Sequence, residues 1–246
     1  ALKTDDFDAI IHLAAVSSGK NLNLMRDVNV TGTKNLYESV LSSKTNPIKI
    51  VHFSTAAVVG PAQPVKIVDE DVQCNPETPY EITKLESEKI AKEYGRSYGL
   101  PVVVIRPVHV YGPLKVDDLL LTMLRMIKRG VVVKPPKIPL DLLNVKNLAY
   151  AVGLLIDSKN TTGRTYIVKD AVTYTTDKLI DTMVATMKRK PLMLRIPRPV
   201  FKIYSKYSKQ FRYGLNGVQF SDERIINDTG YTPLINLKQG IREYIG

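Results

Sequence analysis

The stretch Ile48-Lys-Ile-Val-His-Phe-Ser54 is the middle one of three strand-like segments, and the order of these segments decides the fold. Before it lies Asp8-Ala-Ile-Ile-His-Leu-Ala-Ala15, and after it lies Pro101-Val-Val-Val-Ile-Arg106. These are short apolar runs without regular alternation, which is typical of strands buried on both faces of a parallel sheet.

Helical patterns fill the two intervals between these strands. Residues 22–41 place Met25, Val28, Leu36 and Val40 on one side of a predicted helix, and residues 79–98 form a second amphipathic pattern. Strands and helices that alternate in this way form parallel sheets with right-handed crossovers. Residues 1–112 therefore predict an α/β, Rossmann-type doubly wound fold.

The pattern changes after Pro113. An amphipathic helix is predicted over 116–129, prolines interrupt the loop that follows, and 142–168 returns to apolar strand-then-helix character. We expect 113–246 to form a smaller mixed α/β domain, with 142–168 rejoining the first sheet.

Composition restricts the class of protein. The chain has 246 residues, a net charge of +11 and a single cysteine, Cys74. No apolar run approaches the length of about 18 residues that a membrane helix needs. One cysteine fits a reducing compartment, and three scattered histidines make no metal-binding motif, so we expect a cytoplasmic protein without a metal site.

Most of the positive charge lies in one segment. No Asp or Glu occurs between Thr182 and Ser221. The segment contains nine cations: Lys188, Arg189, Lys190, Arg195, Arg198, Lys202, Lys206, Lys209 and Arg212. It is either a solvated face, a site for a phosphate-bearing ligand, or a contact with an anionic membrane through 188–212. Nucleic acid is not expected, because no nucleic-acid-binding motif accompanies it.

The start of the second helix, Pro79-Tyr80-Glu81-Ile82-Thr83-Lys84, carries the candidate chemistry. Residues four apart lie on one helix face, so a phenol lies beside an ammonium group. A nearby cation lowers a tyrosine pKa, and we therefore expect Tyr80 to serve as a general acid/base. The same spacing occurs at Tyr111/Lys115 and Tyr174/Lys178, but neither of those pairs lies within a convincing helix.

The segments together resemble the extended short-chain dehydrogenase/reductase family, in particular its nucleotide-sugar epimerase/dehydratase group, to which UDP-glucose 4-epimerases belong. The matching motifs follow the family's order along essentially the whole chain. They are Ile11-His-Leu-Ala-Ala15, Asn29-Val-Thr-Gly-Thr33, Phe53-Ser-Thr-Ala-Ala-Val-Val-Gly60, Tyr80 with Lys84, Arg106-Pro-Val-His-Val-Tyr-Gly-Pro113, Asn144-Val-Lys-Asn-Leu-Ala149, and Gly230-Tyr-Thr-Pro233 with Leu237-Lys-Gln-Gly240.

The resemblance implies a role for each residue that matches a motif. The implied catalytic residues are Thr55, Tyr80 and Lys84. The implied NAD-binding residues are Leu13, Ala14, Ala15, Asn29, Ser54, Tyr80, Lys84 and Pro107. For substrate, the motifs indicate Thr55 and His109, and the basic segment adds Arg195, Arg198 and Arg212 as candidates for a phosphate clamp.

The chain departs from the family's pattern in two ways. His109, Val59 and Lys146 replace an Asn, a Tyr and an Asp, which could shift substrate choice. The first strands and the glycine-rich turn that cradles the pyrophosphate are absent, so we expect an N-terminally truncated portion of a longer enzyme. A complete protein that lost dinucleotide binding is the other interpretation.

For the intact enzyme the resemblance implies an NAD-dependent epimerase or dehydratase, and it leaves NADP open. Its substrate would be a nucleotide-diphosphate sugar, its intermediate a 4-keto sugar, and its assembly a homodimer. The product could feed polysaccharide biosynthesis. A reductase of a keto-sugar, steroid or similar ketone is the alternative enzyme, and an interaction protein independent of NAD is the alternative from another class.

Overall fold

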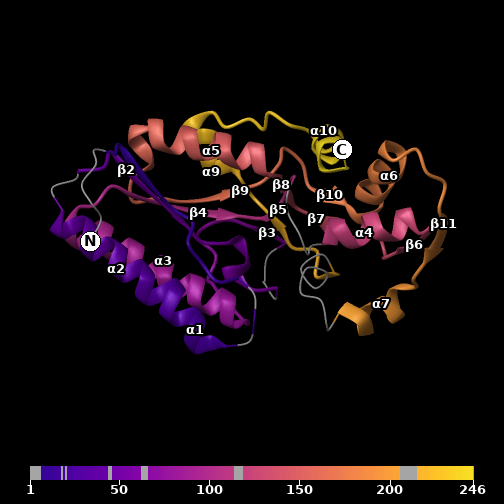
Figure 1. The fold of residues 1–246 in the computed structure, drawn as a ribbon, viewed down its shortest axis with the longest axis horizontal. Helices are drawn as coiled ribbons and strands as arrows, with labels where there is room; N and C mark the ends of the chain where they lie inside the picture. Colours follow the sequence, from indigo (N-terminus) through magenta and orange to yellow (C-terminus); the bar gives the residue numbers. More distant parts are fainter. Residues whose placement is uncertain are drawn as a thin grey trace.

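The computed structural model describes residues 7–17, 19, 21–43, 46–61, 66–113, 119–205 and 215–245, and it has the predicted α/β architecture (Figure 1). Its central sheet has the strand order β1-β2-β4-β9, and every neighbouring pair is parallel. The strands are β1 (Ala9–His12), β2 (Lys49–Phe53), β4 (Val102–Pro107) and β9 (Thr165–Val168). The prediction of a doubly wound parallel sheet is confirmed.

Helices cover both faces of this sheet (Figure 1). On one face lie α2 (Gly32–Ser42) and α3 (Pro79–Tyr98), and on the other lie α5 (Val145–Asp157) and α9 (Glu223–Thr229). Successive strand side chains point to opposite faces of the sheet, so alternate residues pack into the two apolar layers between sheet and helices. One layer contains Tyr37, Ile50, Ala91, Tyr94, Val102 and Val104, and the other contains Val51, Val103, Ile105, Ala151, Val152 and Leu155.

Strand β1 is less buried than its apolar sequence suggests. Ile11 is 45% exposed, and within the described residues β1 pairs on one side only, with β2. The prediction of burial on both faces is wrong for the described chain, because β1 lies at an edge of the sheet.

The first predicted helix is interrupted. Helix α1 (Leu22–Arg26) passes into a π-helical turn, η1 (Asp27–Thr31), before α2 begins. A π-helical turn adds a residue to the helical repeat and redirects one side chain. Asn29 lies within this turn and is buried.

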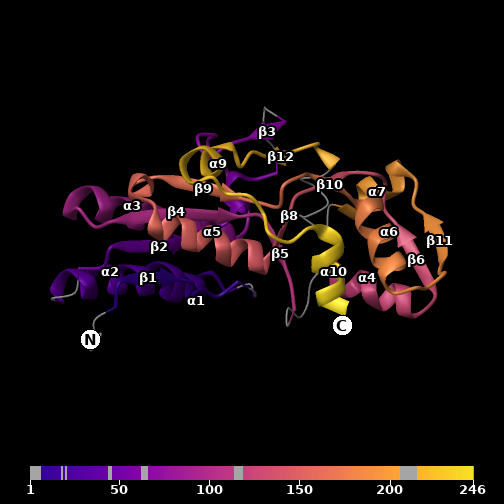
Figure 2. The ribbon, with the colours of Figure 1, turned by 90° about the horizontal axis from the view of Figure 1, so that it is seen from above.

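Several of the remaining elements form the other end of the molecule (Figure 2). They pack around a second apolar core that includes Leu120, Met123, Ile127, Leu179 and Ile241. The helices at this end are α4 (Leu119–Lys128), α6 (Thr176–Thr186), α7 (Arg198–Ser205) and α10 (Leu237–Ile245). The 3-10 turns η2 (Ala56–Val59) and η3 (Lys159–Thr161) adjoin the central sheet instead. The short strands are β3 (Ile67–Val68), β5 (His109–Tyr111), β6 (Val131–Lys134), β7 (Pro139–Leu140), β8 (Leu142–Asn144), β10 (Tyr174–Thr175), β11 (Leu192–Arg195) and β12 (Gln219–Phe220). Among the described helices, none has the length and apolar character needed to cross a bilayer.

Gly60 ends the turn η2 and cannot carry a side chain without rearrangement. Its φ is +77°, and a Cβ there would overlap the backbone carbonyl of Asn75. We expect Gly60→Ala to lower the free energy of unfolding by about 2–4 kcal/mol, since left-handed strain and a steric overlap combine. The control is Gly99→Ala: its φ is +68° but its surroundings are open, so we expect a loss of about 1 kcal/mol. Equal losses of the free energy of unfolding in the two variants, measured by urea denaturation, would contradict a steric overlap at Gly60.

Candidate active site

Helix α3 begins with a complete set of start signals. The Thr78 side chain accepts a hydrogen bond from the Glu81 backbone N–H, the Glu81 carboxylate accepts one from the Thr78 backbone N–H, and Pro79 is the first helical residue. This capping box and the fixed φ of proline set where the helix starts. Tyr80 and Lys84 therefore lie in its first two turns, as the sequence predicts.

Lys84 is a buried cation. The residue is only 3% exposed. Its ammonium group has no hydrogen-bond or ion-pair partner in the described part of the chain. Burial lowers the pKa of Lys84 to about 8, and the Glu88 carboxylate partly opposes this shift. A buried group that remains a donor without an acceptor is suited to a ligand rich in hydroxyl groups.

The predicted direction of the Tyr80 pKa is wrong for this structure. Burial of the phenol, followed by the negative charge of Glu81, raises the pKa of Tyr80. Because the pKa of Tyr80 rises, Lys84 does not offset these two effects. Tyr80 is a neutral phenol here, and it needs a further positive charge nearby to become a proton acceptor near neutral pH.

Two hydroxyl groups follow β2 at its carboxyl end. Thr55 begins the turn η2, and its hydroxyl oxygen accepts a hydrogen bond from the Ala57 backbone N–H at 3.3 Å. Its own proton is left available for an acceptor. The Ser54 hydroxyl is buried and has no hydrogen-bond partner among the described residues. Because η2 packs against α3, the two hydroxyls lie on the side of the sheet that also carries Tyr80 and Lys84.

Asn29 ties the loop after β1 to α3. Its side-chain oxygen accepts from the Val16 backbone N–H at 2.7 Å, and its amide nitrogen donates to the Val16 carbonyl and to the Thr83 hydroxyl. The amide is thus used in fixing the backbone that carries Leu13, Ala14 and Ala15. Direct contacts of these four residues with a cofactor stay predictions.

Two buried histidines lie on the neighbouring strands β1 and β2, and we did not predict a role for them. His12 and His52 are register partners on β1 and β2, and their ring centroids are 5.4 Å apart. The His12 ring pairs with the Thr33 hydroxyl at 2.9 Å, and the His52 ring with the Ser87 hydroxyl at 3.4 Å. Burial, followed by the charge of Lys84, lowers the pKa of His12 to about 4, and the same two causes lower the pKa of His52 well below its usual value.

The charge of Lys84 acts on both rings, which lie on the neighbouring strands β1 and β2. Both histidines are neutral near pH 7, so they add no charge that would compete with the ammonium. The sequence does contain a signal for them, since each occurs near the end of a predicted strand.

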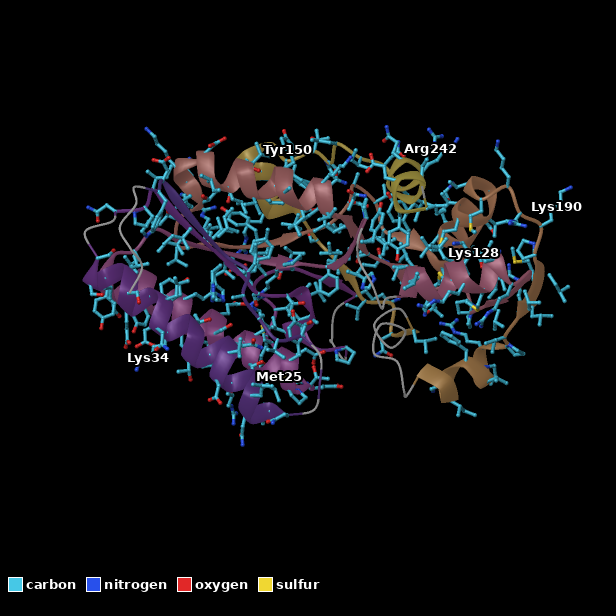
Figure 3. The ribbon with its side chains drawn as sticks, viewed as in Figure 1. Met25, Lys34, Lys128, Tyr150, Lys190 and Arg242 are labelled. Atoms are coloured by element: carbon cyan, nitrogen blue, oxygen red, sulfur yellow. The ribbon has the colours of Figure 1, made fainter. Side chains whose placement is uncertain are left out.

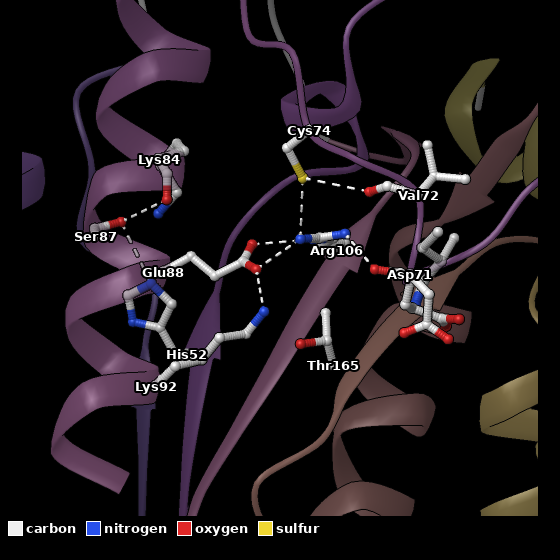
Figure 4. Close-up of polar contacts among 12 residues, drawn as sticks. His52, Asp71, Val72, Cys74, Lys84, Ser87, Glu88, Lys92, Arg106 and Thr165 are labelled. Atoms are coloured by element: carbon white, nitrogen blue, oxygen red, sulfur yellow. Dashed lines mark hydrogen bonds and ion pairs between the residues drawn. The ribbon is translucent and has the colours of Figure 1, made fainter. Parts of the chain in front are cut away.

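A buried ion pair supports the same helix (Figure 4). The Arg106 guanidinium donates two hydrogen bonds to the Glu88 carboxylate, at 2.7 and 3.0 Å, and both residues are at most 3% exposed. Lys92 adds a second cation at 2.6 Å from Glu88. Burial alone would raise the pKa of Glu88, but the hydrogen bonds and charges of Arg106 and Lys92 lower it to about 2.

Arg106 also donates to the Glu70 carbonyl and the Cys74 sulfur, at 3.2 and 3.3 Å. It therefore links α3, β4 and the loop after β3 in one network. The spacing Lys84, Glu88, Lys92 on successive helical turns is the signal in the sequence that could have indicated this network.

The residues predicted to bind substrate lie far apart in the sequence, on several elements. Pro107 ends β4, and His109 is half-buried on the neighbouring strand β5. Arg195 is exposed on β11, where it pairs with Asp177 at 3.1 Å, and Arg198 is exposed at the start of α7. No contact within the described residues joins either arginine to Thr55, Tyr80 or Lys84, so the phosphate clamp stays a prediction. Arg212 lies outside the described residues.

The buried charge of Lys84 has a consequence for stability. We expect Lys84→Met to raise the free energy of unfolding by about 1–3 kcal/mol near pH 7. The folded state holds this proton less tightly than the unfolded chain, because burial lowers the Lys84 pKa from 10.5 to about 8. The gain is full below about pH 8, shrinks as the pH rises towards 10.5 and is absent above that value.

Urea denaturation across this pH range measures the effect. Lys89→Met is the matched control, since Lys89 is exposed on the same helix and we expect no change. A lower stability of the Lys84→Met variant at pH 7 would show that the ammonium is not desolvated in the folded protein.

Comparisons with known proteins agree with this geometry. Residues 1–168 match the model of the NAD dependent epimerase/dehydratase family. The chain belongs to that family, and the predicted resemblance is confirmed.

Relatives and solved structures cover most of the chain. A trifunctional UDP-glucose 4,6-dehydratase/UDP-4-keto-6-deoxy-D-glucose 3,5-epimerase/UDP-4-keto-L-rhamnose-reductase of Arabidopsis thaliana is 28% identical over 94% of this chain and 32% of its own length. A UDP-glucose 4-epimerase of Vibrio cholerae is 24% identical, over 79% of this chain and 60% of that protein. The structure of UDP-glucuronic acid 4-epimerase from Bacillus cereus with NAD superposes with a TM-score of 0.79, at 20% identity, over 97% of this chain and 73% of that one.

The structural match shows the shared fold. The chain spans only part of the length of the curated relatives it matches, 32% and 60% in the two cases above.

Proposed function

We infer that the protein carrying this chain is an NAD-dependent epimerase or dehydratase that oxidises a nucleotide-diphosphate sugar to a transient 4-keto sugar. The observation that carries this proposal is the buried, unpartnered ammonium of Lys84, which lies one helical turn from Tyr80 and on the same side of the sheet as the hydroxyl of Thr55. Membership of the epimerase/dehydratase family supports it.

The residues of this site fit a dinucleotide. The Ser54 hydroxyl directly follows β2 at its carboxyl end and is buried without a partner in the described chain. Helix α3, which carries the buried residue Lys84, packs against the turn that comes next. Ligands of open α/β sheets bind at the carboxyl ends of the strands. Bound NAD⁺ would supply the hydride acceptor and a positive charge. Lys84 would hold the hydroxyl groups of the nicotinamide ribose, and the backbone of Leu13 to Ala15, fixed by Asn29, would lie along the cofactor.

Thr55 and Tyr80 then have separate roles in the transfer of the substrate proton. Thr55 donates a hydrogen bond to the sugar oxygen that reacts, which orients it towards the phenol. Tyr80 accepts the proton of that hydroxyl group as a general base and returns it as a general acid. The raised pKa of Tyr80 means that it acts as a base only when cationic groups surround it, so proton abstraction depends on the loaded site.

The experiment is an assay of the full-length protein that carries this chain, with UDP-glucose and UDP-glucuronic acid in the presence of NAD⁺ and with products separated by chromatography. An epimerase returns the hydride and consumes no net cofactor. Stoichiometric loss of NADPH with a keto-sugar or another ketone would favour the reductase instead. No turnover, together with no binding of NAD⁺ in calorimetry, would overturn the proposal.

Other features of the intact enzyme are also proposals. Residues 1–112 would supply the cofactor side and 113–246 mainly the substrate side, with His109 near the sugar. A homodimer and a cytoplasmic location are further predictions, which sedimentation and cell fractionation test.

A further inference from the structure

The two parallel strands β6 and β11 form a small sheet with an exposed aliphatic face. Their register pairs Leu192 with Val131 and Leu194 with Val133. Register partners lie on the same face of a sheet, and so do residues two apart on one strand. These four side chains therefore share one face. Leu192 and Leu194 are 61% and 47% exposed, and Val131 and Val133 are 40% and 37% exposed.

Five cations lie at one end of this face. Because the strands are parallel and in register, the turns that precede them lie at the same end, and Leu192 donates a backbone hydrogen bond to Gly130. Figure 3 shows Lys128 and Lys190 at this end of the molecule. The exposed cations are Lys128 and Arg129 before β6, and Lys188, Arg189 and Lys190 before β11.

The two acids of α6, among the described residues, pair with cations outside this cluster. On α6, Asp181 pairs with Lys134 at 2.6 Å and Asp177 pairs with Arg195 at 3.1 Å, so both are occupied by cations outside the cluster. The next acid along the sequence after Asp181 is Asp222. The charge at the end of the face therefore remains positive.

The apolar surface continues beyond β11. Helix α7 follows after two residues, and Figures 1 and 2 show it at the same end of the molecule. It exposes Val200 and Ile203, at 56% and 65%, while Phe201 is buried and anchors the helix. Residues three apart lie on one helix face, so α7 adds a second aliphatic patch.

We propose that this surface, made of the β6–β11 face and the five cations at its end, docks the protein on an anionic lipid bilayer. Basic groups beside a membrane gain energy from the negative surface potential, and aliphatic side chains gain it by entering the interface. Stable peripheral binding needs two such signals, and the surface has both. Two copies meeting through this face would bring like charges together, which disfavours self-association.

The test is flotation of the purified protein with vesicles of phosphatidylcholine alone and of phosphatidylcholine mixed with phosphatidylserine. We expect binding to the mixed vesicles that weakens with added salt. The variant Arg129→Glu/Arg189→Glu/Lys190→Glu is expected to lower the partition coefficient by about ten-fold or more. Leu192→Ser/Leu194→Ser is expected to lower it to a similar degree.

The control is Lys89→Glu/Lys159→Glu/Lys238→Glu, which changes net charge equally at exposed positions outside the surface and is expected to bind like the wild type. Circular dichroism checks the fold of each variant. Equal partition to both kinds of vesicle, or an equal loss in the control, would overturn the proposal. A concentration-dependent dimer that Leu192→Ser/Leu194→Ser abolishes, without vesicle binding, would assign the face to a second copy instead.

Discussion

Tyr80→Phe is expected to lower kcat for nucleotide-sugar turnover by about a hundred-fold or more, because the phenol is the proposed route of the substrate proton. The change removes one oxygen atom from a side chain whose hydroxyl makes no hydrogen bond in the described structure. We therefore expect little change in the free energy of unfolding and in the Kd for NAD⁺. A fall in kcat without a matching rise in Kd separates proton transfer from binding.

The control for this variant is Tyr98→Phe. Tyr98 is 59% exposed at the other end of the same helix and contacts Tyr94 only through its ring. We expect its kcat to equal that of the wild type. Activity of Tyr80→Phe that is unchanged within two-fold, measured by the same chromatographic assay, would remove Tyr80 from the mechanism.

Arg106→Met is expected to lower the free energy of unfolding by about 3–5 kcal/mol, since it leaves the Glu88 carboxylate buried with less compensation. The guanidinium also satisfies the Glu70 carbonyl and touches the Cys74 sulfur, so those contacts disappear too. Urea denaturation measures the loss. Arg106→Met/Glu88→Gln provides the comparison, and we expect it to be less destabilised than Arg106→Met because no ionised carboxylate is stranded.

The pH dependence gives a second measure of the same ion pair. Folding lowers the pKa of Glu88 from 4.5 to about 2, so the wild type binds this proton less tightly when folded. The stabilisation is fully present above about pH 4.5 and is lost as the pH falls towards 2. The advantage of the wild type over Arg106→Met should therefore shrink over this range. A difference that is constant with pH, or below about 1 kcal/mol at pH 7, would contradict a buried, charged pair.

The elements that the sequence predicts well are those whose signals are local. Alternating strands and helices predict the parallel sheet, and the residues around Pro79 predict the start of α3 with Tyr80 and Lys84 on one face. Each of these depends on spacing within about 20 residues along the chain.

The features that were missed depend on depth and register, which a single sequence does not specify. Tyr80 has a raised pKa because it is buried beside Glu81, whereas spacing alone indicates only its neighbour Lys84. The pairing of His12 with His52 depends on the register of two strands that lie 40 residues apart. Likewise, Arg195 belongs to the basic segment in sequence, but in space it faces Asp177 on α6.

In the proposed function, Thr55, Tyr80 and Lys84 form an oxidoreductase site for a nucleotide sugar. The measurement that tests this site is the ultraviolet absorbance of reduced nicotinamide after the full-length protein is mixed with NAD⁺ and UDP-glucose or UDP-glucuronic acid in a stopped-flow instrument. We expect a transient rise in absorbance with the wild type, and a rise at least about a hundred-fold slower with Tyr80→Phe. No rise with either sugar while NAD⁺ is bound, or equal rates in the two proteins, would contradict it.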